Sequence, residues 1–392
     1  MNIVAHFSVA ELLIAFVFTF LILLYFGRIG IVRNVFDPLI LMHLQLVFTV
    51  VLLGWSGLLP VEQVFYLLCV YAWMAWQWKG AFSGGISECV GWKYCVILLV
   101  LISIPANLYL LLTKGFILFQ EDVGAAKVEF YQGVGIVRRI NTALAVILPV
   151  HVFVKWHLER AWSRWLSVGL LYSIFIILSL GSKAGVALLA FSYGSVLYFS
   201  DVRQNKATLI VVFLLSIISS LFMFFLVYGS GFLIDLGIRV VAFADGPFYY
   251  FKEGMSIDVP FAYPFYIFAY AARLIEALPV TSLGPEINWR FFGLNDELYG
   301  PNPQIFVESV AIFGPAAFFY YIVFGLIIFL FAKYARNPYS FAVWITFLRP
   351  FPGDSQLAFS NLYTIFFVLM LYVAAGFIVR LLKNASRSLM VA

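Results

Sequence analysis

The stretch Phe7–Phe26, FSVAELLIAFVFTFLILLYF, decides what kind of protein this chain forms. Its apolar length matches the roughly 20 residues that a helix needs to cross the hydrocarbon layer of a bilayer. No Lys or Arg precedes it and Glu11 lies within it, so it lacks the basic start of a cleavable signal peptide. We therefore expect a retained first transmembrane helix.

The rest of the chain has the same character. Of its 392 residues, 64% are hydrophobic and 11% are charged, whereas soluble domains are about half apolar and about a quarter charged. The apolar residues form long runs rather than alternating segments of about ten residues, which favours helices over a membrane β-barrel. This pattern predicts an all-α polytopic integral membrane protein with about eleven transmembrane helices.

Most of the further transmembrane helices follow directly from the apolar runs. We expect them at Leu39–Leu59, Val61–Trp78, Tyr94–Leu112, Ile140–Val154, Leu166–Leu180, Gly185–Phe199, Ala207–Val227, Pro315–Ala332 and Leu362–Val379. A tenth span, starting near Phe341, is the least regular, because Arg349 and Pro350 interrupt it before about 20 residues are reached.

The Lys and Arg residues set the expected orientation. Placing Arg28 and Arg33 inside gives an inner side rich in cations, as the positive-inside rule requires, with the N-terminus outside and the C-terminus inside. The largest outer segment is then a loop at about 228–313, and a smaller outer loop covers about 113–139. Within the large loop, Pro260–Leu278 is apolar but contains charges and prolines, so we expect a short interfacial helix there. The whole chain, 1–392, is interpreted as one membrane domain.

Several cations oppose the positive-inside bias and are candidates for binding an anion such as a lipid phosphate. They are Lys114, Lys127, Arg138, Arg139, Lys183, Arg239, Lys252, Arg273, Arg290 and Arg349. Lys183, in the turn Gly181–Gly185, and Arg349 are the most notable, because each interrupts apolar sequence with no adjacent acid. For any single cation, pairing with ordinary headgroups or loop acids is the simpler interpretation.

Outer carboxylates supply candidates for a general base. They include Asp245, Asp296, Glu297 and Glu308, and Glu308 lies where an apolar span begins. All four histidines fall outside the large loop. His43 lies within the second span, where we expect it to join helices rather than to relay protons. Glu11 receives the same interpretation.

Composition also bounds the cofactors and partners. Cys69, Cys89 and Cys95 have no metal-like spacing, so neither a metal nor a disulfide is expected. The segment Gly85–Gly91 lacks the spacing of a phosphate-binding loop, which disfavours a nucleotide-driven machine. The net charge of +5 is scattered between spans rather than gathered in a patch, so nucleic acid is not an expected partner.

Three segments together resemble the O-antigen polymerase family. The first is Leu180–Gly185, similar to the family's short Gly-Ser-Arg-Gly type of turn, with Lys183 in place of the commoner Arg. The second runs from Gly300-Pro301-Asn302-Pro303 through Glu308 to Phe313-Gly314, and the third is Arg349-Pro350-Phe351. The resemblance covers the chain from about Lys114 onward and depends as much on architecture as on these motifs.

The resemblance implies a membrane glycosyltransferase that polymerises undecaprenyl-pyrophosphate-linked oligosaccharide repeat units into O-antigen, capsule or a related polysaccharide. It places the protein in the bacterial inner membrane with its large loop in the periplasm, its N-terminus periplasmic and its C-terminus cytoplasmic. The donor is already activated, so no nucleotide, metal or other cofactor is needed. The lipid-linked oligosaccharide and the bilayer are the expected partners, and a chain-length regulator protein is a possible further one.

The resemblance also assigns roles to residues. Glu308 first and Asp296 second would orient or deprotonate the acceptor hydroxyl. Cations would bind the pyrophosphate and stabilise its charge as the glycosidic bond breaks. These pyrophosphate-binding residues would be Arg139, Lys183, Arg290, Arg349 and Arg239. Trp289, Tyr299 and Asn302 would contact the saccharide, although anchoring at the membrane interface explains the aromatic residues equally well.

Two other classes stay open at this point. A transporter or flippase of lipid-linked oligosaccharides would use intramembrane charges and broken helices, but one long outer loop and the absence of an evident inverted repeat count against it. An O-antigen ligase-like transferase shares the architecture, but the ligases carry a catalytic His in the large loop and this loop has none.

Overall fold

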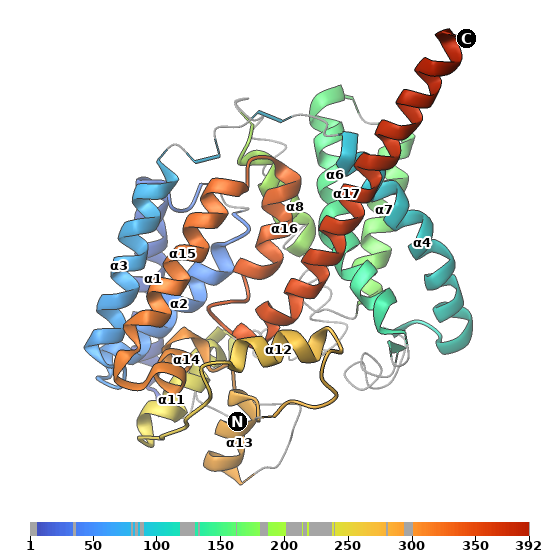
Figure 1. The fold of residues 1–392 in the computed structure, drawn as a ribbon. Coiled ribbons are helices and arrows are strands. Elements are labelled where there is room, and N and C mark those ends of the chain that lie inside the picture. Colours follow the sequence, from blue (N-terminus) through green and yellow to red (C-terminus); the bar gives the residue numbers. More distant parts are fainter. Residues whose placement is uncertain are drawn as a thin grey trace. The chain divides into compact units, whose positions relative to one another are not determined.

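A computed structural model describes residues 6–33, 37–79, 81–82, 85–86, 90–117, 130–131, 134–161, 163–180, 187–200, 214, 218, 237–238, 240–279, 281–293 and 301–391. All regular elements within these ranges are helices, as Figure 1 shows. The chain divides into two compact units, each assembled from separate stretches of sequence. The first contains 1–82, 228–334 and 344–363, and the second contains 83–227, 335–343 and 364–392.

The first unit begins with three apolar helices: α1 (Val9–Ile29), α2 (Ile40–Trp55) and α3 (Val61–Trp78). The Ser8 hydroxyl accepts a hydrogen bond from the Glu11 N–H at the start of α1, and the Glu11 carboxylate accepts one from the Ser8 N–H. Glu11 therefore acts as a cap in the first turn instead of joining helices within the membrane. Helix α1 packs on α2, and α3 packs on α15 (Phe318–Tyr334), which returns from the far end of the sequence.

Short helices fill the segment predicted as the large loop. They are the 3-10 turn η4 (Ala242–Ala244), α11 (Asp245–Lys252), α12 (Tyr263–Ala271), α13 (Leu283–Phe292), α14 (Gln304–Phe313) and the 3-10 turn η5 (Gly314–Ala316). At about 1.5 Å per residue, none of them is long enough to cross a hydrocarbon layer of about 30 Å. The expected short helix within Pro260–Leu278 is α12. That the segment lies in the periplasm stays a prediction.

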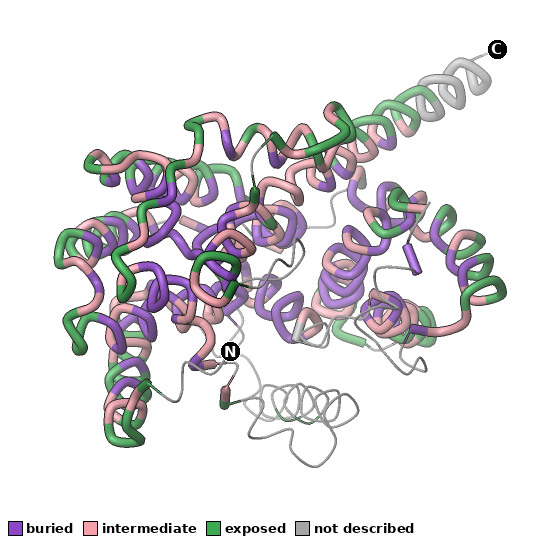
Figure 2. Tube along the Cα trace, turned by 90° about the horizontal axis from the view of Figure 1, so that it is seen from below, coloured by how far each residue is buried: buried purple, intermediate pink, exposed green. Residues whose placement is uncertain are grey.

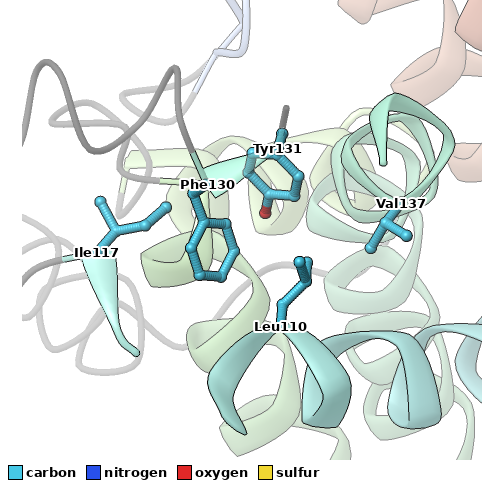
Figure 3. Close-up of a cluster of buried hydrophobic side chains, with 5 residues drawn as sticks. All are labelled: Leu110, Ile117, Phe130, Tyr131 and Val137. Atoms are coloured by element: carbon cyan, nitrogen blue, oxygen red, sulfur yellow. The ribbon is translucent and has the colours of Figure 1, made fainter. Parts of the chain in front are cut away.

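The second unit is built around α6 (Gly135–Glu159), which packs on α4 (Val90–Lys114), α7 (Arg164–Ser179) and α8 (Ala187–Leu197). Within this unit, the cluster of buried side chains in Figure 3 contains Leu110 of α4 and Val137 of α6, together with Ile117, Phe130 and Tyr131.

Two buried amides also tie α4 to α6. Asn107 and Asn141 donate to each other's side-chain oxygen at 3.0 Å and 2.7 Å. Such a reciprocal pair satisfies polar groups that would otherwise be costly to bury among apolar helices.

Two helices near the C-terminus belong to both units. Helix α16 (Pro338–Leu348) ends just before Arg349-Pro350, where the proline disfavours further helix, so it is shorter than a membrane crossing requires. Helix α17 (Ser355–Val391) begins earlier than the predicted start at Leu362, because the Asp354 side chain accepts a hydrogen bond from the Leu357 N–H and caps the first turn.

The protein is a helical membrane protein. In the described residues, four helical windows are long and apolar enough to cross a bilayer, namely Val9–Ile29, Gly91–Lys114, Gly135–Glu159 and Ser355–Leu381. Shorter apolar helices lie at several other predicted spans, including α2, α7 and α15. The predicted span Ala207–Val227 lies outside the described residues except for 214 and 218. A total of about eleven crossings therefore stays a prediction.

The exposure of the long helices fits a lipid environment. Only 17% of the most apolar window of α1, and the same share of that of α17, is buried inside the protein. The remainder of these windows is exposed or half-buried, as Figure 2 shows along α17 toward the C-terminus. In water this apolar surface would be costly, so it is explained by contact with acyl chains.

Gly246 provides a test of the packing around α11. A Cβ at this position would overlap the carbonyl oxygen of Asn302, which is backbone and cannot turn away. We expect Gly246→Ala to lower the thermal unfolding midpoint by several degrees in detergent. The matched change Gly54→Ala, in a helix where a Cβ meets nothing within 4 Å, should be neutral or slightly stabilising. Equal midpoints for the two variants would contradict this packing.

Candidate functional site

Glu308 forms the centre of the candidate site, in the first unit. It lies on α14 and is 1% exposed. One carboxylate oxygen, Oε1, accepts a hydrogen bond from the backbone N–H of Ser355 at 3.0 Å, and the other, Oε2, accepts one from the Tyr320 hydroxyl. The carboxylate thus links α14 to α15 and to the first turn of α17.

The start of α14 is fixed against the turn that precedes α17. The N–H of Gln304 donates to the Gly353 carbonyl at 3.1 Å, and the N–H of Ile305 donates to the Pro352 carbonyl at 2.8 Å. Gln304 has a φ of 55°, a left-handed backbone conformation that is uncommon for residues other than glycine. Its side-chain amide donates to the Thr49 hydroxyl at 2.9 Å and to the Phe243 carbonyl.

A second set of buried polar groups continues from Glu308 toward α3. Gln63 accepts hydrogen bonds through Oε1 from the Ser309 hydroxyl at 3.1 Å and from the Tyr321 hydroxyl at 2.6 Å. Between α2 and α3, His43 Nδ1 lies 3.1 Å from the Tyr71 hydroxyl. This contact agrees with the expectation that His43 joins helices. Glu308 therefore lies in an extended polar interior instead of being an isolated charge.

Burial changes the protonation of the acids at this site. Burial and, to a smaller extent, the nearby Asp354 carboxylate raise the pKa of Glu308 from its ordinary value of 4.5 to about 8, although the Tyr320 and Ser355 hydrogen bonds oppose the rise. Burial also raises the pKa of Asp354. Both acids lie outside the four candidate membrane windows and α15. A carboxyl group with a pKa near neutrality can take up or release a proton at physiological pH.

Of the expected pyrophosphate-binding cations that the structure describes, two lie in this unit. Arg349 ends α16, is half-buried, and belongs to the same turn, 349–354, that contacts α14. Arg290 lies on α13, where its guanidinium pairs with Glu286 at 2.7 Å and donates to the Ser256 carbonyl at 2.8 Å. The backbone of this turn therefore joins Arg349 to the Glu308 site, and Arg290 forms an ion pair with Glu286 on its own helix.

Arg139 lies in the second unit. It is half-buried in the first turns of α6, next to the exposed Arg138. The nearby Tyr131 donates its hydroxyl hydrogen to the Ser179 carbonyl at 3.0 Å and accepts a hydrogen bond from Asn141 at 3.1 Å. This network ties the start of α6 to the last turn of α7, which precedes the Lys183 turn in the sequence.

The expected saccharide contacts divide between described and undescribed residues. Trp289, on α13, is 53% exposed, so its indole is available for a sugar face or for a headgroup boundary. Asn302 is exposed, and its backbone packs closely on Gly246. Asp296, Tyr299, Lys183 and Arg239 lie outside the described residues, so their proposed roles stay predictions.

Sequence reasoning missed the neighbours of Glu308. Tyr320, Asp354 and Ser355 were not among the candidates, although Asp354 follows the Arg349-Pro350 turn closely. Gln63, an amide inside the apolar run Val61–Trp78, was also overlooked. An amide in an apolar span needs a buried partner, and that rule could have drawn attention to it.

Comparisons with protein-family models, with curated proteins and with solved structures found no match to this chain. A search for a metal centre among the described residues found no group of three or more His, Cys, Asp or Glu side chains that could hold an ion. The arrangement around Glu308 is consequently the basis for a functional proposal.

The raised pKa of Glu308 predicts a dependence of stability on pH. The folded protein binds this proton more tightly than the unfolded chain does. The contribution of Glu308 to the free energy of unfolding is therefore complete below about pH 4.5 and is lost as the pH rises through about 8. We expect the thermal unfolding midpoint to fall by several degrees over this range. Glu308→Gln should flatten the fall but not abolish it, because burial also raises the pKa of Asp354 and of Asp245.

The control is Glu253→Gln, which removes an exposed carboxylate from the same predicted loop. It should keep the wild-type slope. An unchanged slope in Glu308→Gln would show that Glu308 titrates outside this range.

Proposed function

We propose that this protein is a membrane glycosyltransferase that polymerises undecaprenyl-pyrophosphate-linked oligosaccharide repeat units on the periplasmic face of the bacterial inner membrane. One observation carries the proposal. Two of the three segments that resemble the O-antigen polymerases, the described part 301–314 of the second and the turn that begins at Arg349, lie against each other around a buried acid. Apolar packing alone does not require two segments about forty residues apart to meet around buried polar groups, so their meeting favours a functional site.

The acid suits the acceptor half of the reaction. In the proposed step, a sugar hydroxyl of one repeat unit takes the place of the Tyr320 hydroxyl at Glu308 Oε2. The hydroxyl oxygen forms a bond to the anomeric carbon of the second unit, the bond from that carbon to the pyrophosphate breaks, and the proton passes to the carboxylate. A base is most effective when its pKa lies near the working pH, and a pKa of about 8 meets that requirement.

The leaving group is undecaprenyl pyrophosphate, which departs with additional negative charge. Arg349 would stabilise that charge, since a guanidinium presents several donors to phosphate oxygens in fixed geometry. Arg139, Lys183 and Arg239 are further candidates, whereas Arg290 would first have to leave Glu286. Because the donor carries its own activation in the pyrophosphate bond, the proposed reaction needs no nucleotide.

The exposed Trp289 is the described aromatic residue best suited to a saccharide in this unit. Its indole offers a flat apolar face, and most of the side chain remains open to solvent or headgroups. Tyr299 and Asn302 are the other saccharide contacts predicted from the sequence. In this arrangement, the segment around Trp289 binds the saccharide, and residues 301–314 hold the Glu308 carboxyl group in position.

The direct test is a polymerisation assay with purified protein in detergent, supplied with undecaprenyl-pyrophosphate-linked repeat units and no nucleotide. We expect a ladder of longer chains from the wild type. Glu308→Gln should slow ladder formation at least about a hundredfold, the usual contribution of a general base. Arg349→Ala should slow it as well, with partial recovery in Arg349→Lys, which restores the charge but not the fork of donors.

Two further variants separate the alternatives. Glu253→Gln is the matched control and should keep wild-type activity, while Asp296→Asn shows whether the second-ranked acid is the base instead. Each variant must elute as a monodisperse, folded species. A wild type that gives no ladder but moves lipid-linked oligosaccharide across liposome membranes would replace the polymerase with the flippase.

A further inference from the structure

A groove of about 460 Å³ lies between the start of α4 and the C-terminal part of α17, within the second unit. It is separate from the Glu308 site, whose residues all belong to the first unit. Its lining consists of Gly91, Tyr372, Val373, Gly376, Phe377, Val379 and Arg380. Among these described residues, the groove is apolar apart from the Tyr372 hydroxyl and the Arg380 guanidinium.

Aromatic contacts fix the wall of the groove. Trp92 lies against Tyr372, with ring centroids 4.6 Å apart, and stacks on Tyr339 of α16 at 5.6 Å and 5°. The Tyr339 hydroxyl lies 2.7 Å from His151 Nδ1 on α6. A Cβ at Gly91 would lie 2.7 Å from the Tyr372 ring, so the glycine allows Tyr372 to approach α4. Four helices thus hold the wall in place, and the groove does not depend on one mobile side chain.

The groove lies where two membrane helices reach the bilayer surface. The stretch of α17 from Ser355 to Val379 has no charged residue, Arg380 is the first that follows it, and α4 begins at Val90, three residues before Lys93. Arg380 is therefore at the boundary between hydrocarbon and headgroups. From Arg380 back to Tyr372 the helix extends about 12 Å into the apolar region, at 1.5 Å per residue. An apolar channel that ends in a cation at this depth matches an acyl chain that ends in a phosphate.

We propose that this groove binds one anionic phospholipid, with an acyl chain along Val373 and Phe377 and the headgroup phosphate at Arg380. Charge supports this occupant, because the described lining residues include no carboxylate and Arg380 is exposed. The sequence that follows Arg380 contains two further cations, Lys383 and Arg387. The volume is in the range of small-molecule sites, and the lipid would cover apolar surface of α17 that the protein itself leaves open.

Gly376 allows the groove to be filled without a clash. A Cβ at this position meets nothing within 4 Å, so Gly376→Leu would place its side chain in the open space. Leucine is also the better helix former, which keeps α17 intact. Ala374→Leu is the matched control, because Ala374 is exposed on the same helix and does not line the groove. For the charge, Arg380→Ala is compared with Arg28→Ala, which removes an exposed cation from the last turn of α1.

The measurement is native mass spectrometry of the purified full chain with equal amounts of phosphatidylglycerol and phosphatidylcholine. We expect the wild type to retain one phosphatidylglycerol in preference to phosphatidylcholine. Arg380→Ala should reduce that preference about fivefold, the usual effect of one cation at an anionic surface. Gly376→Leu should reduce retention of both lipids, and the two control variants should match the wild type.

Two results would overturn the proposal. Equal retention of the two lipids by the wild type would remove the role of charge. Undiminished phosphatidylglycerol in both Arg380→Ala and Gly376→Leu would show that lipid binds elsewhere on the protein.

Discussion

The first unit depends on the hydrogen bonds that satisfy Glu308. A carboxyl group that is 1% exposed is tolerable only when its oxygens have partners, and here they come from the first turn of α17 and from Tyr320 of α15. These contacts bring the start of α14 against the turn 349–354. The position of Arg349 in the fold, and the shape of the proposed acceptor site, follow from that requirement.

The two units differ in how they satisfy the hydrogen bonds of their buried polar side chains. In the first, polar side chains from α2, α3, α14 and α15 meet in an interior that includes Gln63 and Gln304. In the second, the described polar contacts are mainly ties between helices, such as the Asn107–Asn141 pair, and the groove at Arg380 is the proposed lipid site. We propose that the acceptor chemistry belongs to the first unit.

Sequence patterns predicted the helical membrane class and the positions of most helices, because apolar runs of membrane length have few alternative structures. They also selected Glu308 and Arg349, which interrupt apolar sequence. They could not predict the partners of Glu308, since Tyr320 and Ser355 reach it only through the packing of α15 and α17. The end of α16 depends on Pro350 and the start of α17 on the Asp354 cap, and a hydropathy pattern predicts neither effect. The roles of Asp296 and Lys183 stay predictions.

The central claim is that Glu308 acts as the base in repeat-unit polymerisation. The pH dependence of the initial polymerisation rate at low substrate concentration tests it most directly, with unfolding monitored in parallel because stability falls over the same range. We predict a rate that rises with pH and reaches its half-maximum near the Glu308 pKa of about 8. A rate that stays level between about pH 6 and 9, in protein that remains folded throughout, would contradict it.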